Sequence, residues 1–291
     1  MFRRQSCDAP SDRRLAARFI SALVMTSALT LFLTACSSGN TGSSETLLKD
    51  IQSRGVLKVG MYLQYPPAEF RDPKTRQPEG SDVEIAKLLA KDLGVKIHID
   101  DYDFNALIPS LVAKKDDILI ASVAMTPERA AAVDFTQPYY ELDNVILVKQ
   151  NSPIRSLAQA DKRLDQPNAN ISVVLGGISQ VSAERDFQHA NIKAVNTSSA
   201  ALLLESGQVD AQITQYGNAV AYLKNHKNIR MIPGVISGSQ PVAFAIRKGD
   251  PEFLNYLNTW IQFHKIQGDL AAILTKWNVQ QKTQAATSPQ G

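Results

Sequence analysis

The sequence lacks the motifs that mark a metal protein or one of the common enzyme classes. None of its four histidines is spaced from another as zinc ligands usually are: His98, His189, His226 and His264. It contains no Gly-x-Ser-x-Gly, no phosphate-binding loop and no Gly-x-Gly-x-x-Gly. We therefore expect no metal, no cofactor and no catalytic residue.

The chain also lacks a surplus of one charge. It has 31 Lys and Arg against 28 Asp and Glu, a formal net charge of +3. Five arginines and two aspartates precede Cys36, so that residues 36–291 hold 26 basic and 26 acidic residues and are formally neutral. Because binding to phosphate backbones needs clustered positive charge, this balance argues against nucleic acid as a partner.

Long apolar runs are scarce, and the most prominent one lies at 19–33. An arginine-rich leader precedes it, and small residues follow it. The run is too short for a comfortable membrane span, and this order of segments is typical of an export signal.

Cysteine is equally rare, since only Cys7 and Cys36 occur. The run Leu-Thr-Ala-Cys at 33–36 resembles the lipobox of bacterial lipoproteins, in which the signal peptidase cuts before the cysteine and the thiol carries a diacylglycerol anchor. The resemblance implies a lipoprotein signal peptide at 1–35, a lipid on Cys36 and export to the bacterial periplasm or cell surface. A Ser- and Gly-rich tether at 36–45 then links the anchor to the folded part. Because Cys7 leaves with the leader, no cysteine pair remains, and stability must come from the core.

The first part of the remaining chain alternates between strand and helix patterns. Ser81 and Glu84 form a capping box that predicts a helix start, and Gly94 predicts its end. We expect strands at 56–59, 95–99 and 118–122, with helices at 81–93 and 106–114. Such alternation predicts a parallel sheet with right-handed crossovers.

The same order recurs further along the chain. Strands are expected at 171–175, 192–195 and 209–214, and helices at 179–189, 198–206 and 218–225. Extended segments at 144–148 and 242–246 connect the two units, a helical segment follows at 251–277, and residues 285–291 are expected to be disordered. Two α/β units with two connectors predict two lobes joined by two crossing strands.

Four segments in this order resemble the family 3 periplasmic solute-binding proteins of polar amino-acid ABC transporters. They are Tyr-Pro-Pro-Ala-Glu-Phe at 65–70 with 80–86, Ala-Leu-Ile-Pro-Ser-Leu at 106–111, Ser-Val-Ala-Met-Thr-Pro-Glu-Arg at 122–129 with 133–139, and Gly-Gln-Val-Asp-Ala at 207–211. The resemblance implies an α/β fold of two Rossmann-like lobes that close on a ligand, with 46–141 plus 240–284 as lobe 1 and 142–239 as lobe 2. It also implies a monomer that delivers a small-molecule ligand to ABC transporter permease subunits.

The resemblance assigns candidate ligand contacts in lobe 1. Arg129 matches the family arginine that grips the ligand carboxylate, and a planar guanidinium suits that task. Tyr65 matches an aromatic residue over the ligand, Phe104 an apolar contact, and Ser122 a contact at a strand end. Core packing, or a cap in the case of Ser122, is the alternative role for these three residues.

In lobe 2, Gly177, Ile178 and Ser179 match a turn that opens a helix, where free N–H groups suit a carboxylate. Three positions depart from the family pattern. Ala124 and Ile178 replace usual hydroxyl residues, and Gln215 replaces the aspartate that pairs the ligand ammonium. We expect the ligand to carry a carboxylate, and to lack a free α-ammonium or to hold it by a different contact.

Two other functions stay open from the sequence. Some proteins on this scaffold resemble cyclohexadienyl dehydratases and are catalytic, which requires a general acid near the ligand. A ligand-sensing module for a receptor is the other alternative. Binding for transport is the preferred interpretation.

Overall fold

The computed structural model describes residues 46–279. The expected signal peptide, Cys36, the tether and the end of the chain lie outside these residues. Within them, no helix is both long enough and apolar enough to cross a membrane.

Lobe 1 is built on a five-stranded sheet in the order β5-β1-β6-β14-β7. Strand β1 pairs in parallel with β5 and β6, whereas β14 runs antiparallel to β6 and β7. These strands are β1 (Val56–Met61), β5 (Lys96–Asp101), β6 (Ile118–Leu119), β7 (Val133–Phe135) and β14 (Ala245–Arg247).

Helices cover both faces of this sheet because its strands carry apolar side chains on both sides. Leu57 and Val59 belong to the core under α1 (Leu47–Arg54), α2 (Ser81–Asp92), α9 (Pro251–Gln267) and α10 (Asp269–Trp277). Leu119 belongs to a second core with α3 (Leu107–Val112) and the 3-10 turn Phe104–Ala106. The short helix α4 (Pro127–Ala132) contacts α3 and β7.

Lobe 2 is built on a second sheet in the order β10-β9-β11-β8-β12, with β13 also paired to β8. Strands β10, β9 and β11 are parallel to one another, and β8 is antiparallel to β11. The strands are β8 (Tyr140–Lys149), β9 (Asn170–Val174), β10 (Asn191–Val195), β11 (Ala211–Gln215), β12 (Ile229–Met231) and β13 (Ile236–Val242).

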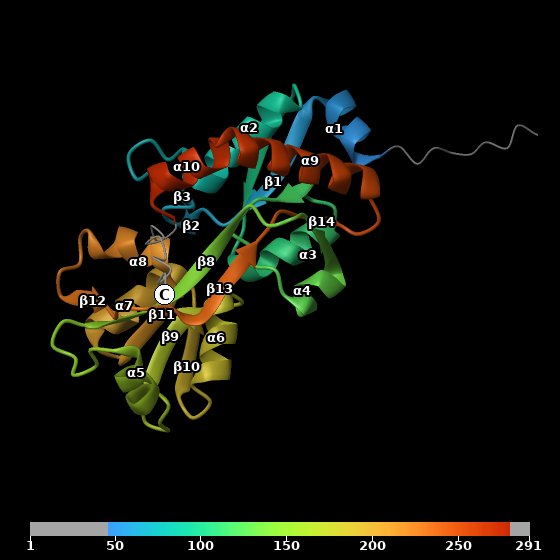
Figure 1. Ribbon diagram of the computed structural model, residues 1–291. Helices are drawn as coiled ribbons and strands as arrows, with labels where there is room; N and C mark the ends of the chain where they lie inside the picture. Colours follow the sequence, from blue (N-terminus) through green and yellow to red (C-terminus); the bar gives the residue numbers. More distant parts are fainter. Residues whose placement is uncertain (1–45, 280–291) are drawn as a thin grey trace, which may run out of the picture. The chain divides into compact units, whose positions relative to one another are not determined.

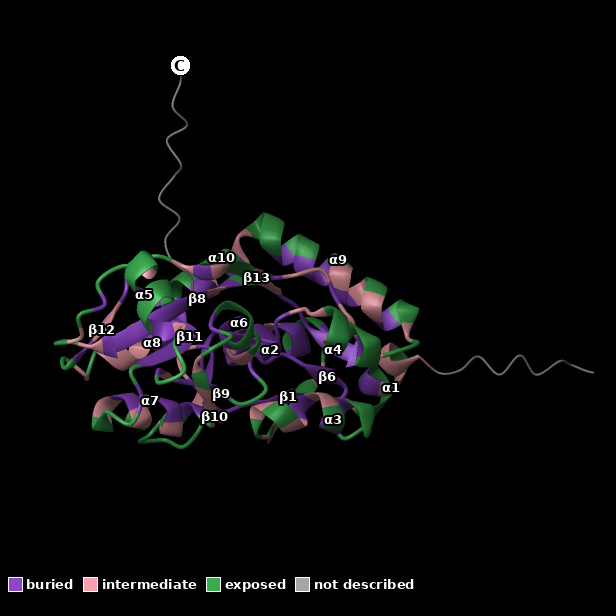
Figure 2. Cartoon of the chain, turned by 90° about the horizontal axis from the view of Figure 1, so that it is seen from below, coloured by how far each residue is buried: buried purple, intermediate pink, exposed green. Residues whose placement is uncertain are grey.

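Strand β8 shows why this lobe needs helices on both sides. Ile146 and Val148 pack in one core, and Val145 and Leu147 pack in the other, as the two-residue period of a strand dictates. The first core includes residues of α5 (Leu157–Leu164) and α6 (Ile178–Asp186), and the second includes residues of α7 (Thr197–Ser206) and α8 (Tyr216–Leu223). Figure 2 shows β8, β9 and β11 buried over most of their lengths.

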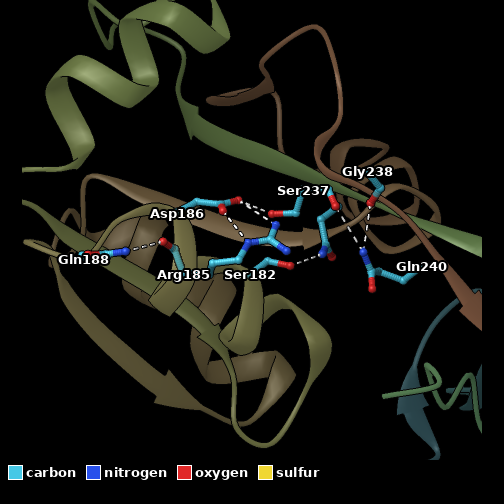
Figure 3. A network of polar contacts seen from close by, with 8 residues as sticks. Ser182, Arg185, Asp186, Gln188, Ser237, Gly238 and Gln240 are labelled. Carbon is cyan, nitrogen blue, oxygen red and sulfur yellow. Dashed lines mark hydrogen bonds and ion pairs between the residues drawn. The ribbon is translucent and has the colours of Figure 1, made fainter. Parts of the chain in front are cut away.

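Two paired strands, β8 and β13, connect the lobes (Figure 1). Strand β13 has an irregularity between Ile236 and Gln240, where Ser237 and Gly238 have positive φ angles of 64° and 68°. The Asp186 carboxylate at the end of α6 accepts hydrogen bonds from Arg185 and Ser237, which ties this bulge to α6 (Figure 3).

A small third sheet lies beside lobe 1, in the order β2-β3-β4. Its strands are β2 (Gln64–Tyr65), β3 (Glu69–Arg71) and β4 (Pro78–Glu79). Tyr65 stands opposite Glu69 in this ladder, so their side chains lie on the same face.

The two-lobed α/β architecture agrees with the sequence prediction, but several local predictions are wrong. The connector expected at 242–246 is not one crossing strand, because β13 ends at Val242 and β14 starts at Ala245 within the sheet of lobe 1. Gly80, not Ser81, is the N-cap of α2, and the Ser81 hydroxyl has no partner among the described residues, so that no capping box forms. The segment 251–277 is two helices, because Gly268 has a φ of 85° and ends α9. Helix α3 is shorter than the expected 106–114, because the 3-10 turn Phe104–Ala106 precedes its start and Lys114, with a φ of 61°, lies beyond its end at Val112.

Candidate functional site

One cavity is lined by residues that come from both lobes and from β8. Most of them stand at or just beyond the carboxyl ends of parallel strands, where open α/β sheets bind ligands. The lining residues are Tyr62, Tyr65, Phe104, Ser122, Ala124, Arg129, Leu142, Val174, Gly177, Ile178 and Gln215. We call this cavity the ligand pocket.

The ligand pocket brings together eight of the nine predicted site residues. The exception is Ser179, which is fully buried near the start of α6 and has a hydroxyl without a partner among the described residues. The role of all nine residues in ligand binding stays a prediction. The sequence reasoning missed Tyr62, Leu142 and Val174. Tyr62 follows β1 and Val174 ends β9, so the strand-end rule could have found both.

Arg129 stands on α4, which starts with a regular cap. The Thr126 hydroxyl accepts a hydrogen bond from the Arg129 N–H at 3.2 Å, and Pro127 occupies the first helical position. The guanidinium donates to the carbonyl of Ala124 at 2.7 Å and to that of Gly176 at 2.8 Å. The second bond crosses from lobe 1 to lobe 2.

No carboxylate within residues 46–279 forms an ion pair with Arg129. Its guanidinium carbon lies 5.5 Å from the centre of the Phe104 ring, and burial lowers the pKa of the side chain. A partly buried cation held only by neutral carbonyls and an aromatic ring favours an anionic partner. The ligand pocket can therefore attract a carboxylate at Arg129.

Gln215 ends β11 and uses both ends of its amide within the protein. Its Oε1 accepts a hydrogen bond from the Tyr65 hydroxyl, and its Nε2 donates to Asn144 Oδ1 at 3.3 Å. Burial raises the pKa of Tyr65, so this hydroxyl is a neutral donor. The amide supplies no charge to a ligand ammonium.

Further hydrogen bonds join the two sides of the ligand pocket. The Tyr62 hydroxyl donates to Thr197 Oγ1 at 3.0 Å, and Asn218 Nδ2 donates to the Pro66 carbonyl at 3.1 Å. Together with the bond from Arg129 to Gly176, they hold the two lobes against one another around the cavity.

The turn before α6 offers fewer free donors than the sequence predicted. The Gly176 N–H donates to Gln180 Oε1 at 2.8 Å, and the Gly177 N–H donates to the Val174 carbonyl at 3.0 Å. Any free donors for an anion must come from the first residues of α6 itself, whose N–H groups have no partner within the helix.

Among residues 46–279, no group of three or more Cys, His, Asp or Glu side chains could hold a metal ion.

Residues 57–280 match the sequence profile of the bacterial extracellular solute-binding proteins, family 3. The chain belongs to this family. The match confirms the family that the four sequence segments implied.

Among individual proteins, this chain is similar to the arginine-binding extracellular protein ArtP of Bacillus subtilis. The two are 30% identical over 260 residues, which cover 88% of this chain and 96% of ArtP. It also resembles the crystal structure of the ancestral amino acid-binding protein AncCDT-1, a precursor of cyclohexadienyl dehydratase, with 35% identity and a TM-score of 0.72. That match covers 79% of this chain and 98% of the other.

A second solved structure is a binding component of an ABC transporter from Wolinella succinogenes, complexed with lysine. It shares 30% identity with this solute-binding protein at a TM-score of 0.71, over 79% of this chain and 98% of the other. The likeness therefore extends to a protein whose structure holds an amino acid.

Proposed function

We propose that this protein is the lipid-anchored receptor of an ABC importer, and that it binds an amino acid or an amino-acid derivative through a carboxylate on Arg129. The observation that carries the proposal is a partly buried guanidinium on the pocket wall that has no acidic partner in the described part of the chain. The relatives that bind arginine or lysine support an amino-acid ligand.

The same cavity supports binding over catalysis. None of the eleven lining residues is an aspartate, a glutamate or a histidine. A dehydratase on this scaffold needs a general acid near the ligand, and these residue types supply it most often. The sequence resemblance and the named relatives point the same way.

The nitrogen side of the ligand should be recognised in an unusual manner. Gln215 is neutral, and both ends of its amide are bonded to Tyr65 and Asn144. Ala124 and Ile178 add no hydroxyl. We infer that the ligand carries a modified nitrogen, or that its ammonium is held elsewhere on the pocket wall.

A thermal-shift panel followed by calorimetry tests the proposal. The panel holds the twenty amino acids, N-modified amino acids, opine-like conjugates and small organic acids. A ligand at 100 times its dissociation constant stabilises the fold by about 2.7 kcal/mol. Each kcal/mol moves the midpoint by about 2–4 °C at this size, so the shift should be roughly 5–10 °C.

The matched variants are Arg129→Ala in the pocket and Arg163→Ala at the exposed end of α5. Loss of one partner of a buried charge pair costs about 3–5 kcal/mol, which is roughly a hundredfold to several thousandfold in affinity. We expect that loss only for Arg129→Ala, with a melting curve close to that of the wild type. Equal affinities for both variants would remove Arg129 from the site.

A further inference from the structure

Two buried carboxyl groups lie behind the wall of the ligand pocket, and neither of them lines it. Glu69 starts β3 and Asp82 stands in the first turn of α2, and both are 0% exposed. The Asp82 N–H donates to the carbonyl of Ala68, the residue before Glu69, at 2.9 Å. No cation within residues 46–279 forms an ion pair with either group.

The two carboxyl groups have opposite surroundings. Asp82 Oδ2 accepts hydrogen bonds from the Ser122 N–H at 2.6 Å and the Ser122 hydroxyl at 2.9 Å, and Oδ1 accepts one from the Tyr139 hydroxyl at 2.8 Å. The start of α2 adds its favourable dipole. Both oxygens of Glu69 lack a donor among the described residues.

These surroundings decide where the single proton of the pair resides. A buried carboxylate without donors is costly, whereas a neutral carboxylic acid can donate to the adjacent Asp82. Burial, and after it the charge of Asp82, raises the pKa of Glu69 well above its ordinary range. Burial also raises the pKa of Asp82, but the hydrogen bonds that its carboxylate accepts oppose that rise. The other titratable groups that face the pair are Tyr65 from β2, Tyr139, and Tyr140 from β8, and burial raises the pKa of each.

The Asp82 carboxylate binds Ser122, a residue of the pocket wall. Ser122 lines the ligand pocket and has a φ of 49°, a left-handed conformation that non-glycine residues rarely adopt. Asp82 binds both its N–H and its hydroxyl, and the same hydroxyl lies 2.6 Å from the Tyr140 hydroxyl. Three polar contacts therefore fix one strained residue.

We propose that Glu69 and Asp82 form a carboxylic acid–carboxylate pair that positions Ser122 on the wall of the ligand pocket, with the proton on Glu69 and the charge on Asp82. Both are positioning residues that act through Ser122. The inference rests on the proposed function only in taking this cavity as the site of ligand binding.

The division of roles predicts opposite results for two isosteric substitutions. In Glu69→Gln the amide replaces the neutral acid and still donates to Asp82. In Asp82→Asn the charge is lost, and an N–H₂ donor replaces one of the two oxygens that accept hydrogen bonds from Ser122 and Tyr139. The amide resonance of Ser122 in ¹⁵N-labelled protein reports on its hydrogen bond to the carboxylate. We expect an upfield shift of its proton in Asp82→Asn and little change in Glu69→Gln.

A pH series tests the position of the proton without any change at Asp82. The pKa of Glu69 is raised in the folded state, so the stability that it contributes is full below its unfolded pKa and falls as the pH rises toward the folded pKa. Glu69→Gln removes this loss. The midpoint of the variant should therefore rise relative to the wild type by roughly 3–5 °C per pH unit above about pH 5, while Glu69 stays protonated in the fold.

The control is Glu252→Gln, the same change on an exposed side chain in the first turn of α9, which should give a curve parallel to the wild type. A curve for Glu69→Gln that also stays parallel would overturn the placement of the proton. An unchanged Ser122 resonance in Asp82→Asn would overturn the positioning role. Neither measurement uses a ligand, so a failure here is distinct from a failure of the proposed function.

Discussion

At the scale of a single residue, Gln215 places a neutral amide on the wall of the ligand pocket. It ends β11 and contacts both lobes. A carboxylate in its place would add the charge that a ligand ammonium needs. Hydrogen bonds to charged groups contribute about 1.5–3 kcal/mol, so Gln215→Asp should improve the affinity for L-arginine roughly tenfold to a hundredfold over its α-hydroxy analogue.

Calorimetry with both compounds measures this ratio. Gln208→Asp is the matched control, since it adds the same charge at an exposed position in the same lobe. If the amino and hydroxy compounds respond alike to Gln215→Asp, residue 215 lies outside the pocket for the nitrogen.

At the scale of the element, the turn before α6 places lobe 2 against lobe 1. Gly176 has a φ of 72°, and a Cβ there would lie 3.2 Å from Cβ of Asn105 in the other lobe. Gly55 has a nearly equal φ of 69° and open space around it. The two glycines separate the cost of the backbone conformation from the cost of the contact.

Both Gly176→Ala and Gly55→Ala should therefore lose about 1–2 kcal/mol of folding free energy, because both force alanine into the left-handed region. Only Gly176→Ala should also weaken ligand binding, because the methyl group presses on Asn105 where the lobes meet. Urea unfolding and calorimetry measure the two effects. Unaltered binding in Gly176→Ala would show that the turn does not limit how closely the lobes approach.

The helices and strands also show which local structures could be predicted from the sequence. The alternation of strand and helix patterns correctly predicts the parallel strands, since apolar runs such as 171–175 must be covered on both faces. The capping box at Ser81 fails for a tertiary reason. Asp82 is drawn to Ser122 and Tyr139, and the Ser81 N–H donates to the Pro67 carbonyl at 3.2 Å, contacts that no local pattern encodes.

In the candidate site, likewise, some residues could be predicted from the sequence but their contacts could not. Positions such as Arg129 and Gln215 could be predicted because they belong to motifs with a recognisable spacing. The partners of those residues could not, because the bonds from Tyr65 to Gln215 and from Arg129 to Gly176 join residues far apart in the chain. The paired carboxyl groups of Glu69 and Asp82 likewise emerge only when β3 and α2 are brought together.

At the scale of the whole molecule, residues of the ligand pocket also bond the two lobes to one another. Tyr65, Arg129 and Tyr62 each line the ligand pocket and each bond to the opposite lobe. Strands β8 and β13 connect the same lobes, and the bulge of β13 is tied to α6, whose first residue, Ile178, lines the pocket. We therefore expect a ligand that changes these bonds to act on both lobes.

The last prediction concerns where the whole molecule resides. The run at 33–36 and the arginine-rich leader indicate a lipid on Cys36. A buried CH₂ group of an acyl chain contributes about 0.8 kcal/mol to membrane binding, and stable anchoring takes two signals, which a diacylglycerol supplies. In a bacterial host given labelled palmitate, the wild type should take up label and sediment with membranes, whereas Cys36→Ser should remain an unlabelled precursor. Cys7→Ser is the matched control, because it changes a leader cysteine and should keep the lipid. Equal labelling of Cys36→Ser and the wild type would refute the anchor.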